Sequence, residues 1–499
     1  MVGSDPLALM VAALLVPVAA AVLIPMAHRL PNLRECVTLV AAGALAFIVW
    51  SLLPHVLSGG RPAFVAAEII PGLSLAFKLE PLGMLFALVA GSLWLVNSIY
   101  SIGYMRGNKE PRQTSFYICF AVAIAATMAI AFAANLFTLF VFYEVLTLTT
   151  YPLVTHKGTP EAMRAGRIYL GLLIGTSMVL LLPAVILTGV TAGTLDFTAG
   201  GILESKLSPA LLGLLLGLFV FGIGKAAVMP VHFWLPAAMV APTPVSALLH
   251  AVAVVKAGVF SVLKIIVYIF GVDALAAAGT GNWLAYVAGA TIIIASLVAL
   301  RQDNLKKRLA FSTVSQLSYV VMAAALFTPA AAMGAAIHIA AHAVAKITLF
   351  FAAGSIYTAA HKTEVSDLDG IGRRMPWTMT AFAIGALAMI GVPPTAGFLG
   401  KWFILEGAMS TAHWFAVAVV ILSTILNAAY FLPIVFRAFL VTPRAAKSAG
   451  AGAAREDSTE HGEAPWPVVL ALTITAMATV MLFLKPDVPL ALARQMIGG

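Results

Sequence analysis

The chain has 499 residues, of which 62% are hydrophobic and only 10% are charged, and its mean hydropathy is +1.01. This composition excludes a soluble globular protein, because so few charged residues could not keep a chain of this length in solution. The net charge of +9 does not indicate nucleic-acid binding, since the basic residues are scattered through short loops without interleaved aromatic residues. The sequence therefore predicts an integral membrane protein.

Apolar runs of about 20 residues recur along the chain, and each is long enough to cross the hydrocarbon core as a helix. The runs are apolar on all sides, which excludes the alternating strands of a membrane barrel. The first run is too long for a signal peptide and is predicted to stay as a helix. The fold class is therefore all-α integral membrane, with about fourteen transmembrane helices. They are predicted at residues 7–27, 36–57, 80–102, 115–133, 135–155, 167–189, 209–241, 245–271, 283–300, 310–327, 332–360, 376–405, 411–440 and 465–484.

Lysine and arginine are concentrated in alternate loops. The loops at 28–34, 106–112, 157–167, 301–308 and 362–374 all belong to the basic set. Because basic loops face the cytoplasm, this bias places both termini on the extracytoplasmic side.

The segment 442–465 is rich in alanine, glycine and charge, and is predicted to be a flexible cytoplasmic linker before the last helix and tail, 466–499.

Neither a metal site nor a bound cofactor is indicated by the sequence. The two cysteines, Cys36 and Cys119, are too far apart for a metal-binding motif, and no haem ligand pair stands out. A glycine-rich dinucleotide motif is also missing. We therefore expect no cofactor, and no catalytic role in a redox reaction.

Five lysines fall inside predicted spans, at positions 225, 256, 264, 346 and 401. A lysine inside a bilayer costs several kcal/mol unless it is paired or hydrated, so such residues mark ion pathways more often than packing accidents. Among the acidic residues, Glu144 is the one well inside a span. A partnerless carboxyl there would be neutral. The alternatives are a structural carboxyl and one half of a switchable pair with a lysine.

Two of these lysines accompany predicted helix breaks. Lys225 precedes Pro230 by five residues, and Lys401 follows the pair Pro393 and Pro394. Proline removes a backbone hydrogen bond, and broken membrane helices are tolerated where they line a wet cavity. Corresponding breaks in two halves of a chain are typical of transporters. The alternative is a kink with a lysine that snorkels to the interface.

Histidine and lysine also form a ladder on one predicted helix. His338, His342 and Lys346 are spaced i, i+4, i+8 and therefore share a helix face. His250 and Lys256 form a looser pair on another span. Histidine titrates near neutral pH and a buried lysine can be brought there, so this pattern favours a proton relay over merely hydrogen-bonded side chains. For Lys264, the sequence supports equally a side chain that snorkels to the membrane interface and a functional role in the pathway.

The stretch 222–258, with Lys225, the segment Met229 to Pro236, the segment Ala241 to His250, and Lys256, resembles a known family. It is similar to the antiporter-like subunits shared by respiratory complex I, membrane-bound hydrogenases and Mrp-type cation/proton antiporters. The resemblance covers nearly the whole chain. It implies a bacterial cell-membrane protein with three N-terminal helices in 1–110 and two inverted five-helix repeats, in 111–272 and 280–441.

The resemblance also implies roles for the buried charges. Glu144 and Lys225 would form the first charge pair, Lys256 and the ladder with Lys346 would link two proton half-channels, and Lys401 would take the exit-side position. Lysine there, where some complex I members have glutamate, is similar to the Mrp D-type subunit.

We therefore expect a proton-translocating subunit of a multisubunit Na⁺ or K⁺/proton antiporter, partnered by other membrane subunits. The alternatives are a proton-pumping subunit of a complex I-type or hydrogenase-type assembly and, with less support, a non-transporting scaffold.

Overall fold

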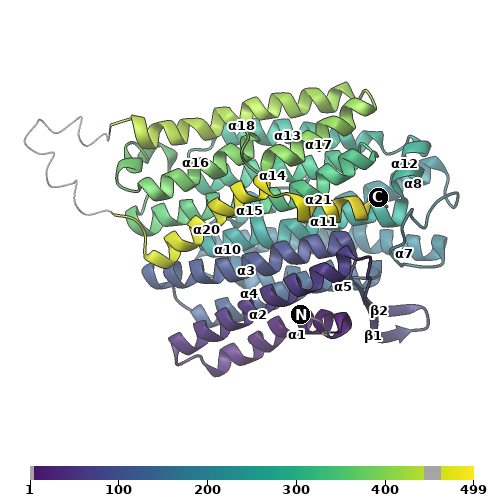
Figure 1. The fold of residues 1–499 in the computed structure, drawn as a ribbon, viewed down its shortest axis with the longest axis horizontal. Helices are drawn as coiled ribbons and strands as arrows, with labels where there is room; N and C mark the ends of the chain where they lie inside the picture. The colour runs from purple at the N-terminus through teal and green to yellow at the C-terminus, as the bar shows by residue number, and fades with distance from the viewer. Residues whose placement is uncertain (1–4, 443–461, 499) are drawn as a thin grey trace, which may run out of the picture.

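The computed structural model describes residues 5–442 and 462–498 as a bundle of long, nearly parallel helices with one small β-hairpin (Figure 1). This architecture confirms the predicted helical membrane fold class. Most of the predicted linker, residues 443–461, lies outside the described residues.

The main α-helices and the hairpin strands have the following bounds: α1 (Pro6–Met26), α2 (Pro31–Leu57), β1 (Ala63–Ile70), β2 (Leu73–Lys78), α3 (Pro81–Gly107), α4 (Gln113–Ala131), α5 (Leu136–Val154), α6 (Pro160–Thr176), α7 (Leu182–Ala192), α8 (Pro209–Gly222), α9 (Trp234–Ala237), α10 (Thr243–Ala247), α11 (Val254–Ile265), α12 (Val272–Ala278), α13 (Asn282–Arg301), α14 (Leu305–Ala324), α15 (Pro329–Ala360), α16 (Pro376–Ile390), α17 (Gly397–Ser410), α18 (Trp414–Leu440), α20 (Trp466–Leu484) and α21 (Asp487–Met496). Short 3₁₀ and π-helical turns join some of them: η1 (Ser177–Leu181), η2 (Gly224–Ala226), η3 (Ala238–Val240), η4 (Leu248–Val252), η5 (Ile266–Phe270), η6 (Val365–Asp367) and η7 (Ile371–Arg373).

Within the described residues, eleven helical segments are long and apolar enough to cross a membrane. The helices α8 and α16 are apolar but shorter, with 14 and 15 residues, and each is followed by a helix break. The predicted count of fourteen spans stays a prediction.

The connections gather at the two ends of the bundle (Figure 1). We call the end that carries the loops 27–30, 108–112, 155–159, 302–304 and 361–375 the basic end, and the end that carries β1 and β2 the hairpin end. The antiparallel hairpin was not predicted. Its strand β1 is almost wholly exposed, so it lacks the buried face that produces an alternating pattern.

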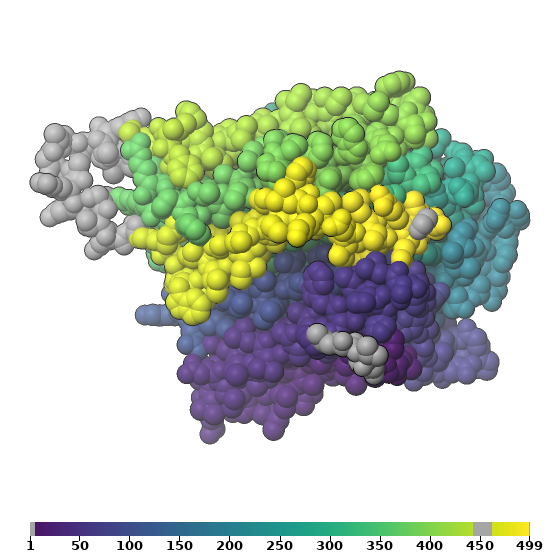
Figure 2. Space-filling model, in the orientation of Figure 1, coloured from purple at the N-terminus to yellow at the C-terminus, as the bar shows by residue number. Residues whose placement is uncertain are grey.

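Helix α15 is the centre of the bundle. It packs against α3, α14, α16, α17 and α20. Its small residues allow this close approach: a Cβ at Gly334 would lie 2.8 Å from the backbone nitrogen of Ile404 on α17. The C-terminal helices α20 and α21 run across one face of the molecule, between the N-terminal helices and α16 to α18 (Figure 2).

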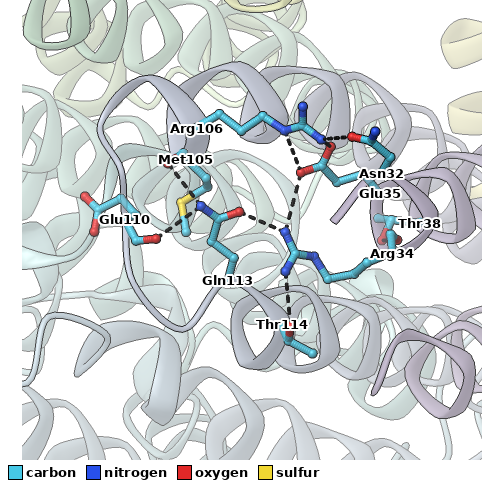
Figure 3. A network of polar contacts seen from close by, with 9 residues as sticks. All are labelled: Asn32, Arg34, Glu35, Thr38, Met105, Arg106, Glu110, Gln113 and Thr114. Atoms are coloured by element: carbon cyan, nitrogen blue, oxygen red, sulfur yellow. Dashed lines mark hydrogen bonds and ion pairs between the residues drawn. The ribbon is translucent and has the colours of Figure 1, made fainter. Parts of the chain in front are cut away.

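At the basic end, an ion-pair network ties α2 to α3 and α4 (Figure 3). Glu35 accepts hydrogen bonds from the Arg106 guanidinium at 2.5 and 3.0 Å. Arg34 lies 3.5 Å from the same carboxylate and donates to Gln113 at 2.8 Å and to Thr114 at 3.1 Å. The side chains of Arg34 and Glu35 are both buried, so the network holds the N-terminal helices to the rest of the bundle.

Replacing Glu35 by alanine should destabilise the protein, because it leaves Arg34 buried without its carboxylate. We expect the free energy of unfolding to fall by about 2 kcal/mol. This is less than the cost of breaking a fully buried ion pair, since the Arg106 side chain is 47% exposed. The midpoint of thermal unfolding of the full chain in detergent measures this effect. Glu68→Ala, on the exposed strand β1, is the matched control and should leave the midpoint unchanged. Equal midpoints for both variants would contradict the prediction.

Candidate functional site: a buried line of basic residues

All five lysines predicted inside spans are buried. Four have no exposed surface, and Lys401 is 5% exposed. None of the five side chains is exposed, as a snorkelling lysine would be. Each amine is instead held inside the bundle by hydrogen bonds, and the partners differ along the line.

The first break positions Lys225. Helix α8 ends at Gly222, and the chain turns through η2 before α9 begins. The helix therefore ends before Lys225 and well before Pro230, earlier than expected. The Lys225 Nζ donates to the Tyr143 carbonyl of α5 at 2.9 Å and to the Thr147 hydroxyl, and it lies 3.2 Å from the centre of the Tyr143 ring. Neutral groups thus hold the amine.

Glu144 is the neighbour of Tyr143 on α5 and is buried. No ion pair within 4.0 Å joins it to Lys225, although the two groups are close enough to interact electrostatically. The Ser177 hydroxyl in η1 also lies beside the Glu144 carboxyl. The structure therefore holds the Glu144 carboxyl and the Lys225 amine in a separated arrangement, and the predicted alternation between paired and separated states stays a prediction.

A hydrogen bond between two buried side chains is among the contacts that join the two halves of the chain. Lys256 Nζ on α11 is hydrogen-bonded to His342 Nδ1 on α15. His250 lies six residues before Lys256, in the π-helical turn η4, and its ring packs on Phe350 with the ring centres 4.8 Å apart. π-helical turns inside helices are frequent at functional sites. The sequence predicted both residues but not the turn.

The predicted ladder on α15 faces several neighbours. The His338 and His342 rings are 6.2 Å apart, and His338 Nε2 is 3.0 Å from Gln316 Oε1 on α14. Lys346 Nζ donates to the Ser312 hydroxyl at 2.8 Å. The Tyr430 hydroxyl of α18 donates to the same oxygen at 3.2 Å. Hydroxyl and amide groups from α14 and α18 therefore continue the polar line beyond the ladder.

The second break positions Lys401. Helix α16 ends at Ile390 and α17 begins at Gly397, with Pro393 and Pro394 between them. The end of a helix leaves carbonyls without donors. Lys401 Nζ donates to the carbonyls of Ile390 at 2.7 Å and Met389 at 3.2 Å, and to Thr424 at 3.2 Å. A lysine thus satisfies carbonyl groups at the second break, whereas the Tyr143 carbonyl that Lys225 contacts lies inside the continuous helix α5.

Lys264 forms an ion pair that the sequence did not predict. Its Nζ lies 3.2 Å from Glu80 Oε2 and donates to the Ala133 carbonyl at 2.7 Å. Glu80 is buried immediately before α3. It was missed because the predicted helix began at residue 80, which placed it at a span boundary. Its one sequence signal is a carboxylate directly before a helix-starting proline.

Together these groups form a polar line across a largely apolar bundle. Amines, imidazoles and hydroxyls can each donate or accept a proton. Hydrogen bonds join Lys256 to His342 and Lys346 to Ser312, and a ring contact joins His342 to His338. The described residues contain no group of three or more histidine, cysteine, aspartate or glutamate residues that could hold a metal ion. Proton transfer between side chains is within the chemistry of these amines, imidazoles and hydroxyls.

The family described as NADH:quinone oxidoreductase/Mrp antiporter, TM matches residues 133–427. NADH-quinone oxidoreductase subunit N of Desulforudis audaxviator is 33% identical over 446 residues, which cover 87% of this chain and 86% of that protein. The A/B subunit of a probable K(+)/H(+) antiporter of Rhizobium meliloti is 30% identical over 382 residues, covering 74% of this chain but 37% of that longer protein. A chain of the Mrp complex from Dietzia sp. DQ12-45-1b has a similar fold, with a TM-score of 0.85 and 23% sequence identity. The match covers 99% of this chain and 97% of that chain.

Proposed function

Because this chain belongs to the family of membrane subunits described as NADH:quinone oxidoreductase/Mrp antiporter, TM, we propose that it translocates protons as a subunit of a multisubunit cation/proton antiporter. The family match confirms the resemblance predicted from the sequence. The relatives include subunits of respiratory enzymes and subunits of antiporters, so the family alone does not give the type of complex.

The hydrogen bond between Lys256 and His342 is the observation that carries the proposal. It joins Lys256, in the first half of the chain, to the ladder of the second half. We propose that protons reach Lys256 from Lys225. A scaffold subunit would have no need of this line, since each buried lysine adds a desolvation cost that an apolar residue would avoid. We propose that residues 111–272 and 280–441 act as two linked half-channels.

In the proposed switch, the Glu144 carboxylate moves toward and away from the Lys225 amine. In the separated arrangement, Lys225 is held by the Tyr143 carbonyl and Thr147. Bringing the carboxylate into an ion pair with the amine, at about 4 Å or less, would add a Coulomb term of several kcal/mol in the protein interior. Because one pKa unit corresponds to about 1.36 kcal/mol, such a term suffices to load or release a proton on the next lysine of the line.

Lys401 supports the antiporter assignment over a respiratory one. The expectation for an Mrp D-type subunit is a lysine at the exit-side break, and the structure gives this lysine a set of carbonyl and hydroxyl acceptors. A proton-pumping subunit of a complex I-type enzyme is the second candidate. The match to subunit N of an NADH-quinone oxidoreductase over most of both chains favours it.

The proposed location is the cell membrane of a bacterium, where the chain is packed among other membrane subunits. The basic end would face the cytoplasm because of its lysine and arginine loops. Both termini would then lie on the extracytoplasmic side.

Proton flux in inverted vesicles that contain the whole complex tests the proposal. A fluorescent pH probe would report flux after addition of Na⁺, K⁺ or an electron donor such as NADH, and vesicles without this subunit would be the control. We expect Na⁺ or K⁺ to trigger flux that disappears in the control. Flux that responds to electron donors and to neither cation would assign the chain to a respiratory complex instead.

A further inference from the structure

A cavity of about 640 Å³ opens at the basic end, away from the lysine line. Its walls come from the start of α6, the short helix α9 with η3, the start of α14 and the segment after α15. Tyr104 and Thr243, joined by a hydrogen bond of 3.4 Å, belong to its lining and are almost completely buried. The cavity therefore lies where the two halves of the chain meet.

The charged residues that line this cavity are mostly basic. Five basic side chains line it, and Glu161 is the one acidic side chain among its lining residues. The basic residues are Lys157, Arg164, Lys306, Lys307 and Lys362. They come from three segments far apart in sequence, so the fold brings them together.

Two of these lysines are already engaged with the backbone. Lys306 Nζ donates to the Ala241 carbonyl, and Lys362 Nζ donates to the Asp367 carbonyl at 2.8 Å. Both partners are neutral, and Glu110 is an acidic group that lies close enough to attract Lys157 and Lys306. Lys157 and Lys306 are close enough to repel each other. A bound anion would relieve this repulsion.

The cavity also reaches an exposed, apolar part of the surface of α6. Ile168, one turn beyond Arg164 on α6, lines the cavity and is 39% exposed. The neighbouring lining residues Met239 and Val240 are apolar. A ligand with a charged group beside Arg164 could therefore extend an apolar chain along α6.

We propose that this cavity binds the phosphate headgroup of an anionic phospholipid, with its acyl chains lying against α6. Basic pockets between transmembrane helices on the cytoplasmic side are suited to such headgroups. Arg164 and Lys307, which are both exposed at the rim, supply donors to the phosphate, and Ile168 marks the path of the acyl chains. This site is independent of the proposed proton pathway, because none of the lysines at 225, 256, 346 and 401 lines the cavity.

Lipid retention by the full-length chain, measured by native mass spectrometry from detergent, tests the proposal. Phosphatidylglycerol and phosphatidylcholine would be titrated against the wild type and the double variant Arg164→Gln/Lys307→Gln. The control Arg29→Gln/Arg301→Gln removes the same charge from exposed positions at the same end. A charge-preserving variant, Arg164→Lys/Lys307→Arg, separates loss of charge from loss of folding.

We expect the wild type, the control and the charge-preserving variant to prefer phosphatidylglycerol over phosphatidylcholine. Loss of two basic residues should weaken phosphatidylglycerol binding by roughly tenfold or more. Equal binding of the two lipids, or equal retention by the double variant and the control, would overturn the proposal. Retention of inorganic phosphate in place of phosphatidylglycerol, when both are present at equal concentration, would assign the cavity to a free phosphate ion and would also overturn the proposal.

Discussion

Replacing Lys225 by methionine should abolish proton flux while the complex still assembles. Methionine has nearly the same length and apolar character as the lysine stem, but it removes the amine that bonds to the Tyr143 carbonyl and Thr147. The first half-channel then has no group that can carry a proton at its break. Flux in inverted vesicles, compared with the amount of assembled complex, measures the effect. Lys109→Met, at an exposed loop position, is the control and should retain normal flux.

Glu144→Gln should have the same effect, because glutamine keeps the size of the side chain and removes the charge of the proposed switch. Glu68→Gln on the exposed strand β1 is its control. Near-normal flux in either Lys225→Met or Glu144→Gln would eliminate the charge-pair mechanism. Loss of flux together with loss of assembly would instead assign these residues a structural role.

The second large effect is expected at glycines that face the helix breaks. A Cβ at Gly258 would lie 2.4 Å from the backbone nitrogen of Ala226 and 2.4 Å from the carbonyl carbon of Lys225. At Gly397 it would lie 1.8 Å from the Ala388 carbonyl oxygen. Backbone atoms cannot swing aside as a flexible side chain can, so Gly258→Ala must displace the segment that carries Lys225.

We therefore expect Gly258→Ala and Gly397→Ala to lose proton flux, with overpacking of about 1–3 kcal/mol or more lowering the midpoint of thermal unfolding. Gly175→Ala in α6 is the matched control, since a Cβ there meets no atom within 4 Å. Vesicle flux and thermal unfolding in detergent would be measured for all three variants. Normal flux in Gly258→Ala would show that the position of the Lys225 segment does not matter for transport.

The sequence was sufficient to predict the fold class and the buried lysines, because both depend on composition and local spacing. An apolar run predicts a span, and a lysine within it is visible without a structure. The helix break at Lys225 was predicted from Pro230, but the helix ends earlier, at Gly222. There a Cβ would lie 2.5 Å from the backbone nitrogen of Leu181, so packing against another helix marks this end. Packing between distant segments leaves no local pattern.

The partners of the charged groups could not be predicted for the same reason. The i, i+4 spacing of His338 and His342 places both on one face of α15, but it does not show that Gln316 and Lys256 meet them. Likewise, Glu80 pairs with Lys264 across a long sequence separation. The π-helical turn at His250 depends on tertiary contacts and has no signature in residue type.

Because of the contact between Lys256 and His342, protons on the proposed pathway pass through the two halves of the chain one after the other, like current through resistors in series. In two parallel channels, a lesion in one would leave about half of the current. Where two segments share a single junction, the slowest step sets the rate of the whole, and an intact second segment cannot compensate for a blocked first one. Substitutions at Lys225 and at Lys401 should therefore abolish proton flux equally completely, although the two residues belong to different halves of the chain.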